Sequence, residues 1–93
     1  MDEETQRITL VKTLALELLV IDLLSARYLT FPDPAAAAAQ HREHMRNLLS
    51  AVAVPGLDAA LSDLAIGEIG DAMDMVIENA GDSAKRAAER GRR

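Results

Sequence analysis

The segment from Leu14 to Leu24 constrains this chain most, because it is a helix-forming run with apolar side chains on every side. On a helical wheel, Leu14 and Leu18 lie on one side while Leu16 and Val20 lie on the other. A helix that is apolar nearly all round is usually buried nearly all round. We therefore expect a homodimer or larger assembly, with a monomer wrapped by a long third helix as the alternative. The expected oligomer interface comprises Leu14, Leu16, Leu18, Val20, Leu23 and Leu24.

The same segment is not expected to cross a membrane. A membrane-spanning helix needs about 20 apolar residues, and extending this run brings in Lys12, Glu17, Asp22 and Arg27. Successive members of that set lie about 140° apart on a helix, so no side is free of charge. The acidic start Met-Asp-Glu-Glu is unlike a secretory signal, so we expect a cytoplasmic protein.

Composition predicts an all-α fold. The 93 residues include no Cys or Trp and only one Tyr and one Phe, whereas Ala, Leu, Val, Ile and Met supply the apolar content. The positions of proline and glycine residues predict helices at about 3–29, 34–53 and 57–80, within a single domain at 1–81. Because the connections are short, consecutive helices should form an antiparallel hairpin arrangement. Gly67 and Gly70 predict either a kink in the third helix or a close backbone contact.

The end of the chain differs from the rest in charge. Residues 1–80 carry thirteen acidic and five basic side chains, whereas residues 82–93 carry two acidic and five basic ones. We expect 82–93 to be a flexible tail, because it is highly charged and lacks apolar periodicity. Its cations could attract nucleic acid or an acidic partner, although no aromatic residue is present for base stacking. These candidate contacts are Lys85, Arg86, Arg90, Arg92 and Arg93.

An acidic stripe is the most distinctive polar cluster. Glu68, Asp71, Asp74 and Glu78 recur at spacings of three, three and four, which aligns them on one helix face. Aligned carboxylates can hold Mg²⁺ against a substrate phosphate. The Glu-x-x-Asp part resembles the all-helical nucleoside triphosphate pyrophosphatases of the MazG type, over four residues of one helix. That resemblance implies a Mg²⁺-dependent enzyme; the simpler interpretation is a solvated helix face.

His41 and His44 form the only histidine pair, with Glu43 between them. A spacing of three can bring two imidazoles to one metal ion, but two ligands do not complete a site. Packing or a hydrogen bond at the helix surface explains both residues, so we expect no metal or other cofactor here.

These observations favour a non-enzymatic helical interaction or regulatory module, which associates with itself and binds a protein partner. Nucleophilic catalysis has no support, because Cys is missing and the Ser residues lie in no recognisable catalytic setting. The first alternative is a small Mg²⁺-dependent enzyme of phosphate chemistry that uses the acidic stripe. The second is an accessory nucleic-acid binder that acts through the basic tail.

Overall fold

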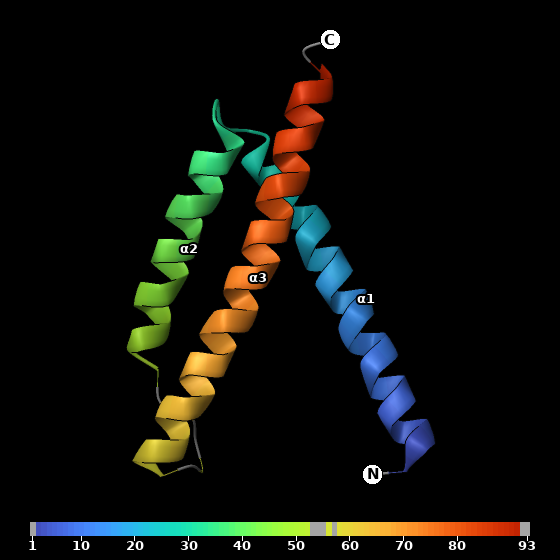
Figure 1. Ribbon diagram of the computed structural model, residues 1–93, viewed down its shortest axis with the longest axis vertical. Helices are drawn as coiled ribbons and strands as arrows, with labels where there is room; N and C mark the ends of the chain where they lie inside the picture. Colours follow the sequence, from blue (N-terminus) through green and yellow to red (C-terminus); the bar gives the residue numbers. More distant parts are fainter. Residues whose placement is uncertain (1, 53–55, 57, 92–93) are drawn as a thin grey trace.

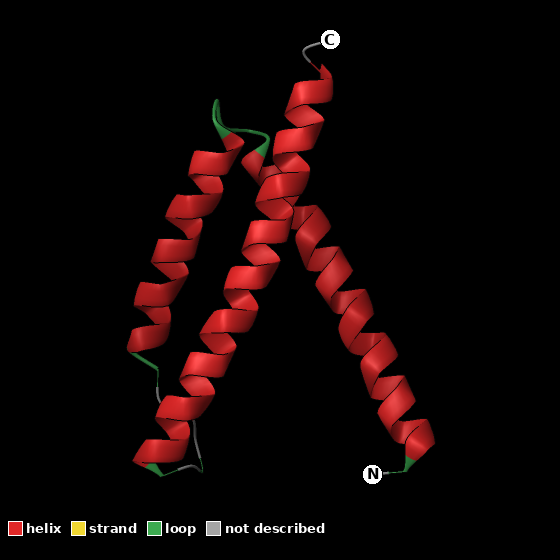
Figure 2. Ribbon diagram, viewed as in Figure 1, coloured by secondary structure: helices red, strands yellow, loops and turns green. Residues whose placement is uncertain are grey.

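The computed structural model describes residues 2–52, 56 and 58–91, and nearly all of them are helical (Figure 2). Helix α1 spans Glu3–Tyr28, α2 spans Pro34–Ser50 and α3 spans Ala59–Gly91. No β-strand occurs in these described ranges. The prediction of an all-α protein with three helices is confirmed.

The helices form an open, flat arrangement (Figure 1). Helices α2 and α3 lie side by side and antiparallel, whereas α1 crosses α3 near its own C-terminal end and then diverges. The Cα radius of gyration is 16.1 Å, compared with about 12 Å for a compact chain of this length. The shortest of the three extents is 13 Å, which matches two helices crossing one over the other.

Aspartate side chains mark the start of each helix. The Asp2 carboxylate accepts a hydrogen bond of 2.7 Å from the Thr5 amide at the start of α1. Asp33 accepts one of 3.2 Å from the Ala36 amide at the start of α2, and Pro34 occupies the first helical position. The Asp58 carboxylate does the same for the Leu61 amide at 2.9 Å. These contacts satisfy amides that have no partner within the first helical turn.

The predicted ends of the first two helices lie close to the observed ones. Helix α1 ends one residue earlier than predicted, at Tyr28. Helix α2 ends at Ser50 rather than at 53, and residue 53 lies outside the described residues. The Ser50 hydroxyl donates a hydrogen bond of 2.7 Å to the Asn47 carbonyl. Such local side-chain bonds compete with the backbone hydrogen bonds that would extend the helix.

The predicted end of the third helix at Ala80 is wrong. Helix α3 continues through Gly81 to Gly91, so the described part of the predicted flexible tail is helical. Gly81 has no left-handed backbone and does not end the helix. It lies against α2 instead: a Cβ atom added there would stand 2.8 Å from the Ala38 Cβ. Gly81 therefore allows α2 and α3 to approach closely, and the prediction that it ends the helix is wrong.

Small side chains dominate the core. Ala80 and Ala84 of α3 are fully buried, and Tyr28, Ala38 and Ile77 complete the buried cluster. At the crossing of α1 and α3, the Ser25 hydroxyl lies 3.4 Å from that of Ser83. Residue 84 is therefore part of the core, beyond the domain boundary predicted at 81.

Candidate interaction site

An apolar groove of about 470 Å³ lies where α1 diverges from α3. One wall comes from α1 and the other from α3, and α2 contributes to the closed end, where α1 meets the other two helices. Two polar side chains, Glu17 and His41, join a lining that is otherwise aliphatic or thioether. Methionine adapts its shape readily, which suits a surface that receives a partner side chain. The apolar lining residues are Leu16, Val20, Leu24, Met45, Ile69, Ala72, Met73, Val76 and Ile77.

The structure divides the predicted interface residues between two surfaces. Leu16, Val20 and Leu24 line the groove, and Leu24 is also partly packed against the core. The other three predicted residues do not line it and are exposed on α1. Their exposed fractions are 48% for Leu14, 67% for Leu18 and 68% for Leu23. Exposure alone does not test the predicted dimer.

Unpartnered surface continues along the N-terminal part of α1. Every residue from 3 to 20 is exposed, and we call this segment the α1 arm. Eight of its apolar side chains are between 43% and 67% exposed. Contiguous apolar surface of this kind is rare on monomers and is typical of interaction sites. The eight are Ile8, Leu10, Val11, Leu14, Leu16, Leu18, Leu19 and Val20.

A tyrosine–histidine pair lies at the closed end of the groove. The Tyr28 hydroxyl and Nδ1 of His41 share a hydrogen bond of 2.5 Å, and the two rings meet edge to face. Burial lowers the pKa of His41, and the charges of His44 and Arg27 lower it further. Burial also raises the pKa of Tyr28. Both shifts favour the uncharged forms, so this contact is a neutral hydrogen bond that joins α1 to α2.

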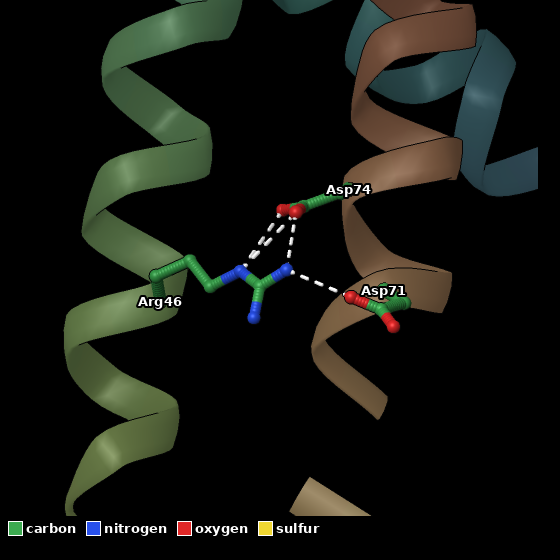
Figure 3. A network of polar contacts seen from close by, with 3 residues as sticks. All are labelled: Arg46, Asp71 and Asp74. Carbon is green, nitrogen blue, oxygen red and sulfur yellow. Dashed lines mark hydrogen bonds and ion pairs between the residues drawn. The ribbon is translucent and has the colours of Figure 1, made fainter. Parts of the chain in front are cut away.

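Arg46 of α2 occupies the middle of the acidic stripe (Figure 3). Its guanidinium donates to Asp74 through Nε at 3.2 Å and through the neighbouring amino nitrogen at 2.5 Å. That amino nitrogen also donates to Asp71 at 3.1 Å. The hydrogen bonds from Arg46 hold the pKa of Asp74 below its usual value. Two stripe carboxylates therefore serve an inter-helix ion pair, which the spacing along α3 alone could not reveal.

The other predicted polar sites are not gathered into one place. Glu68 and Glu78 are exposed and take no part in the Arg46 contacts. Within residues 2–52, 56 and 58–91, no three potential metal ligands come together. Lys85, Arg86 and Arg90 lie on the last turns of α3, whereas Arg92 and Arg93 lie outside the described residues.

Sequence reasoning missed the contacts that join helices. Tyr28 is the only tyrosine and sits in the last turn of α1, but nothing local indicates that it reaches His41. Gly70 does lie at a close contact, but with side chains of α2 and not with another backbone: an added Cβ would stand 2.6 Å from a guanidinium nitrogen of Arg46. An added Cβ at Gly67 meets nothing within 4 Å.

Comparisons with protein-family models, curated proteins and solved structures found no match. Over the residues that the structure describes, no helix combines the length and apolar character needed to span a membrane. The function is therefore argued from the geometry of this chain.

Proposed function

We propose that this chain is a non-enzymatic helical interaction module, which associates with copies of itself and binds a protein partner through an apolar helix. The observation that carries this proposal is the exposed apolar surface of the α1 arm. Helices α2 and α3 pack against each other, whereas the arm extends away from them (Figure 1). Eight large apolar side chains of the arm are 43–67% exposed.

The energetics support association of this surface. Burying a large aliphatic side chain is worth roughly 1.5–3 kcal/mol, so half-exposed ones offer roughly half of that each. Association itself costs about 4–15 kcal/mol in lost freedom of motion. Several of the exposed side chains must therefore be buried together, which a helix laid along the arm achieves and a small ligand does not.

The groove supports the second part of the proposal. Its walls diverge as two helices do, and the space between them suits a third helix with an apolar face. Leu16 and Val20 on one wall face Ile69 and Val76 on the other. Glu17 at the edge provides one charge that can select a basic residue on the partner.

Self-association is tested by light scattering during size exclusion over a dilution series. The wild type should exceed the 10.0 kDa mass of one chain at micromolar concentration. Leu18→Glu and Leu14→Glu should shift the assembly toward the monomer, because each adds a charge to a surface that association buries. A single species with the mass of one chain at every concentration of the wild type would contradict the proposal.

Thr13→Glu is the matched control. Thr13 is exposed in the same arm and carries no large apolar side chain, so its substitution should weaken the assembly less than either leucine substitution. Circular dichroism should show unchanged helix content for all three variants, because positions 13, 14 and 18 are exposed in the single chain.

A further inference from the structure

The charges of α1 follow a regular pattern. Apart from Glu3 and Glu4 in the first turn, its charged residues and its capping Asp2 recur at every fifth position. Their signs are negative, positive, positive, negative, negative and positive in chain order. When the order of the residues is reversed about a point between Leu14 and Ala15, each charge falls at the position of a residue with the opposite charge. The six residues are Asp2, Arg7, Lys12, Glu17, Asp22 and Arg27.

This reversal distinguishes the two ways in which a helix can pair with its copy. In a parallel pair in register, each charge lies level with the same charge on the other helix. In an antiparallel pair centred between Leu14 and Ala15, Arg7 lies level with Asp22 of the other copy and Lys12 with Glu17. Like charges at one level repel and unlike charges attract, so the pattern favours the antiparallel pair for the charges that lie on the side facing the partner.

We propose that α1 pairs antiparallel with α1 of a second copy, about a two-fold axis between Leu14 and Ala15. This inference rests on the self-association proposed above and adds its orientation and register. A two-fold axis makes each contact occur twice, as in an isologous dimer. The two α2–α3 bodies then lie at opposite ends of the helix pair.

One side of α1 has the residues for this contact. Arg7, Val11, Leu14, Leu18 and Asp22 follow each other at spacings of three or four, which places them along one face. All five are exposed, and neither Arg7 nor Asp22 forms an ion pair with any described residue. The apolar middle and the opposite charges at its two ends provide attraction and register together.

The two buried residues of α1, Ser25 and Tyr28, come after the last residue of this face, near the C-terminal end of the helix. The groove residues Leu16 and Val20 lie about 160° from Leu18 on the wheel. An α1 pair formed through the face around Leu18 therefore leaves the groove open for a partner helix.

The available area fits a reversible dimer. With Leu23, nine large apolar side chains of α1 are 43–68% exposed, and together they present on the order of 300–600 Å² of apolar surface. A standard interface takes about 800 Å² from each partner, a little over half of it apolar. One helix seam covers only part of the α1 surface, so we expect micromolar rather than nanomolar affinity.

Spin labels on introduced cysteines test the orientation, since the chain has no cysteine of its own. In an antiparallel pair, labels at Gln6→Cys stand about 25–30 Å apart, because each lies about eight residues from the axis. Labels at Ala15→Cys stand within about 20 Å, the spacing of adjacent helices plus the label arms. Both positions are exposed in the single chain.

The alternatives give different distance patterns. Short distances at both positions would show a parallel pair and overturn the orientation while keeping self-association. Long distances at both would place the interface elsewhere and also overturn the inference. If the labels show no dipolar coupling and light scattering gives the mass of a single chain, the proposed self-association itself has failed.

Charge exchange tests the register independently. Arg7→Glu should weaken the dimer about five- to tenfold in Kd, because two attractive pairs become repulsive. Arg7→Glu/Asp22→Arg should restore the wild-type Kd. The two positions are about 22 Å apart within one helix, so recovery reports contact between chains. A double variant no tighter than the single one would overturn the register.

A second double variant provides the matched control. Arg7→Glu/Glu17→Lys has the same net charge as Arg7→Glu/Asp22→Arg, but it places a lysine at position 17 of one copy level with Lys12 of the other. Its Kd should stay at least as weak as that of Arg7→Glu. Equal recovery in both double variants would show that net charge alone controls the dimer and would overturn the antiparallel register.

Discussion

The two regions of this molecule use their side chains in opposite ways. In the body, where α3 meets α2 and the end of α1, alanine and glycine are buried and the helices approach closely. In the α1 arm, leucine, isoleucine and valine are exposed. In a monomer that buried its largest apolar side chains in its own core, the large side chains would be buried and the small ones exposed. The contrast shows that small residues form the closest helix contacts of this fold, and it supports the association proposed for the large side chains of the arm.

The sharpest test of this contrast compares one large side chain from each region. Tyr28→Ala should lower the free energy of unfolding by about 3–5 kcal/mol, because it empties a core position and removes the hydrogen bond to His41. Leu19→Ala should change it by less than about 0.5 kcal/mol, since Leu19 is 60% exposed. Urea unfolding of dilute monomer measures both, and similar losses would remove the distinction between body and arm.

Two glycines of α3 sharpen the comparison within one helix. Gly81→Ala should destabilise by about 1 kcal/mol, because its Cβ meets the rigid Ala38 Cβ and that clash exceeds the gain in helix propensity. Gly67→Ala should stabilise by up to about 1 kcal/mol, because nothing lies within reach of its Cβ. Thermal unfolding, monitored by circular dichroism, shows whether each substitution raises or lowers stability. Stabilisation by both would show that α2 and α3 approach less closely.

The smallest expected effect concerns pH and the contact between Tyr28 and His41. The pKa of His41 is lower in the folded chain than its ordinary value of 6.5, chiefly through burial. The unfolded chain therefore binds more protons in the interval between the two values, and stability falls as the pH decreases through it. Melting temperature measured from pH of about 7.5 downward should show this decline. His41→Gln should reduce it, whereas His44→Gln should keep most of it, and an unchanged decline in His41→Gln would contradict the assignment.

Local features of the fold were predictable from the sequence. Asp33 and Pro34 fixed the start of α2, because capping and proline geometry depend on neighbouring residues alone. The end of α3 was not predictable in the same way. Asn79, Ala80 and Gly81 form a local pattern for a helix end, but the contact with Ala38 decides the outcome, and Ala38 lies on another helix. Tertiary packing overrides a local propensity of about 1 kcal/mol.

The candidate site shows the same division. The apolar character of α1 was evident from its wheel, and the single chain leaves most of this surface exposed. The groove was not predictable, because its walls depend on the angle at which α1 leaves α3. The spacing of Asp71 and Asp74 along α3 predicted either a Mg²⁺ site or a solvated helix face. It could not reveal that Arg46 of α2, 25 residues from Asp71 in the chain, forms an ion pair with both carboxylates.

The crossing of α1 and α3 has a mechanical consequence. The contact lies near one end of α1, where the hydroxyls of Ser25 and Ser83 meet. The exposed residues from Glu3 to Val20 extend beyond it as a rod of about 27 Å. Such a rod is a lever whose fulcrum is made of small side chains. A rotation of about 10° at the fulcrum moves the far tip by about 5 Å, so a subtle change of packing among alanines and serines becomes a displacement as large as one helical turn.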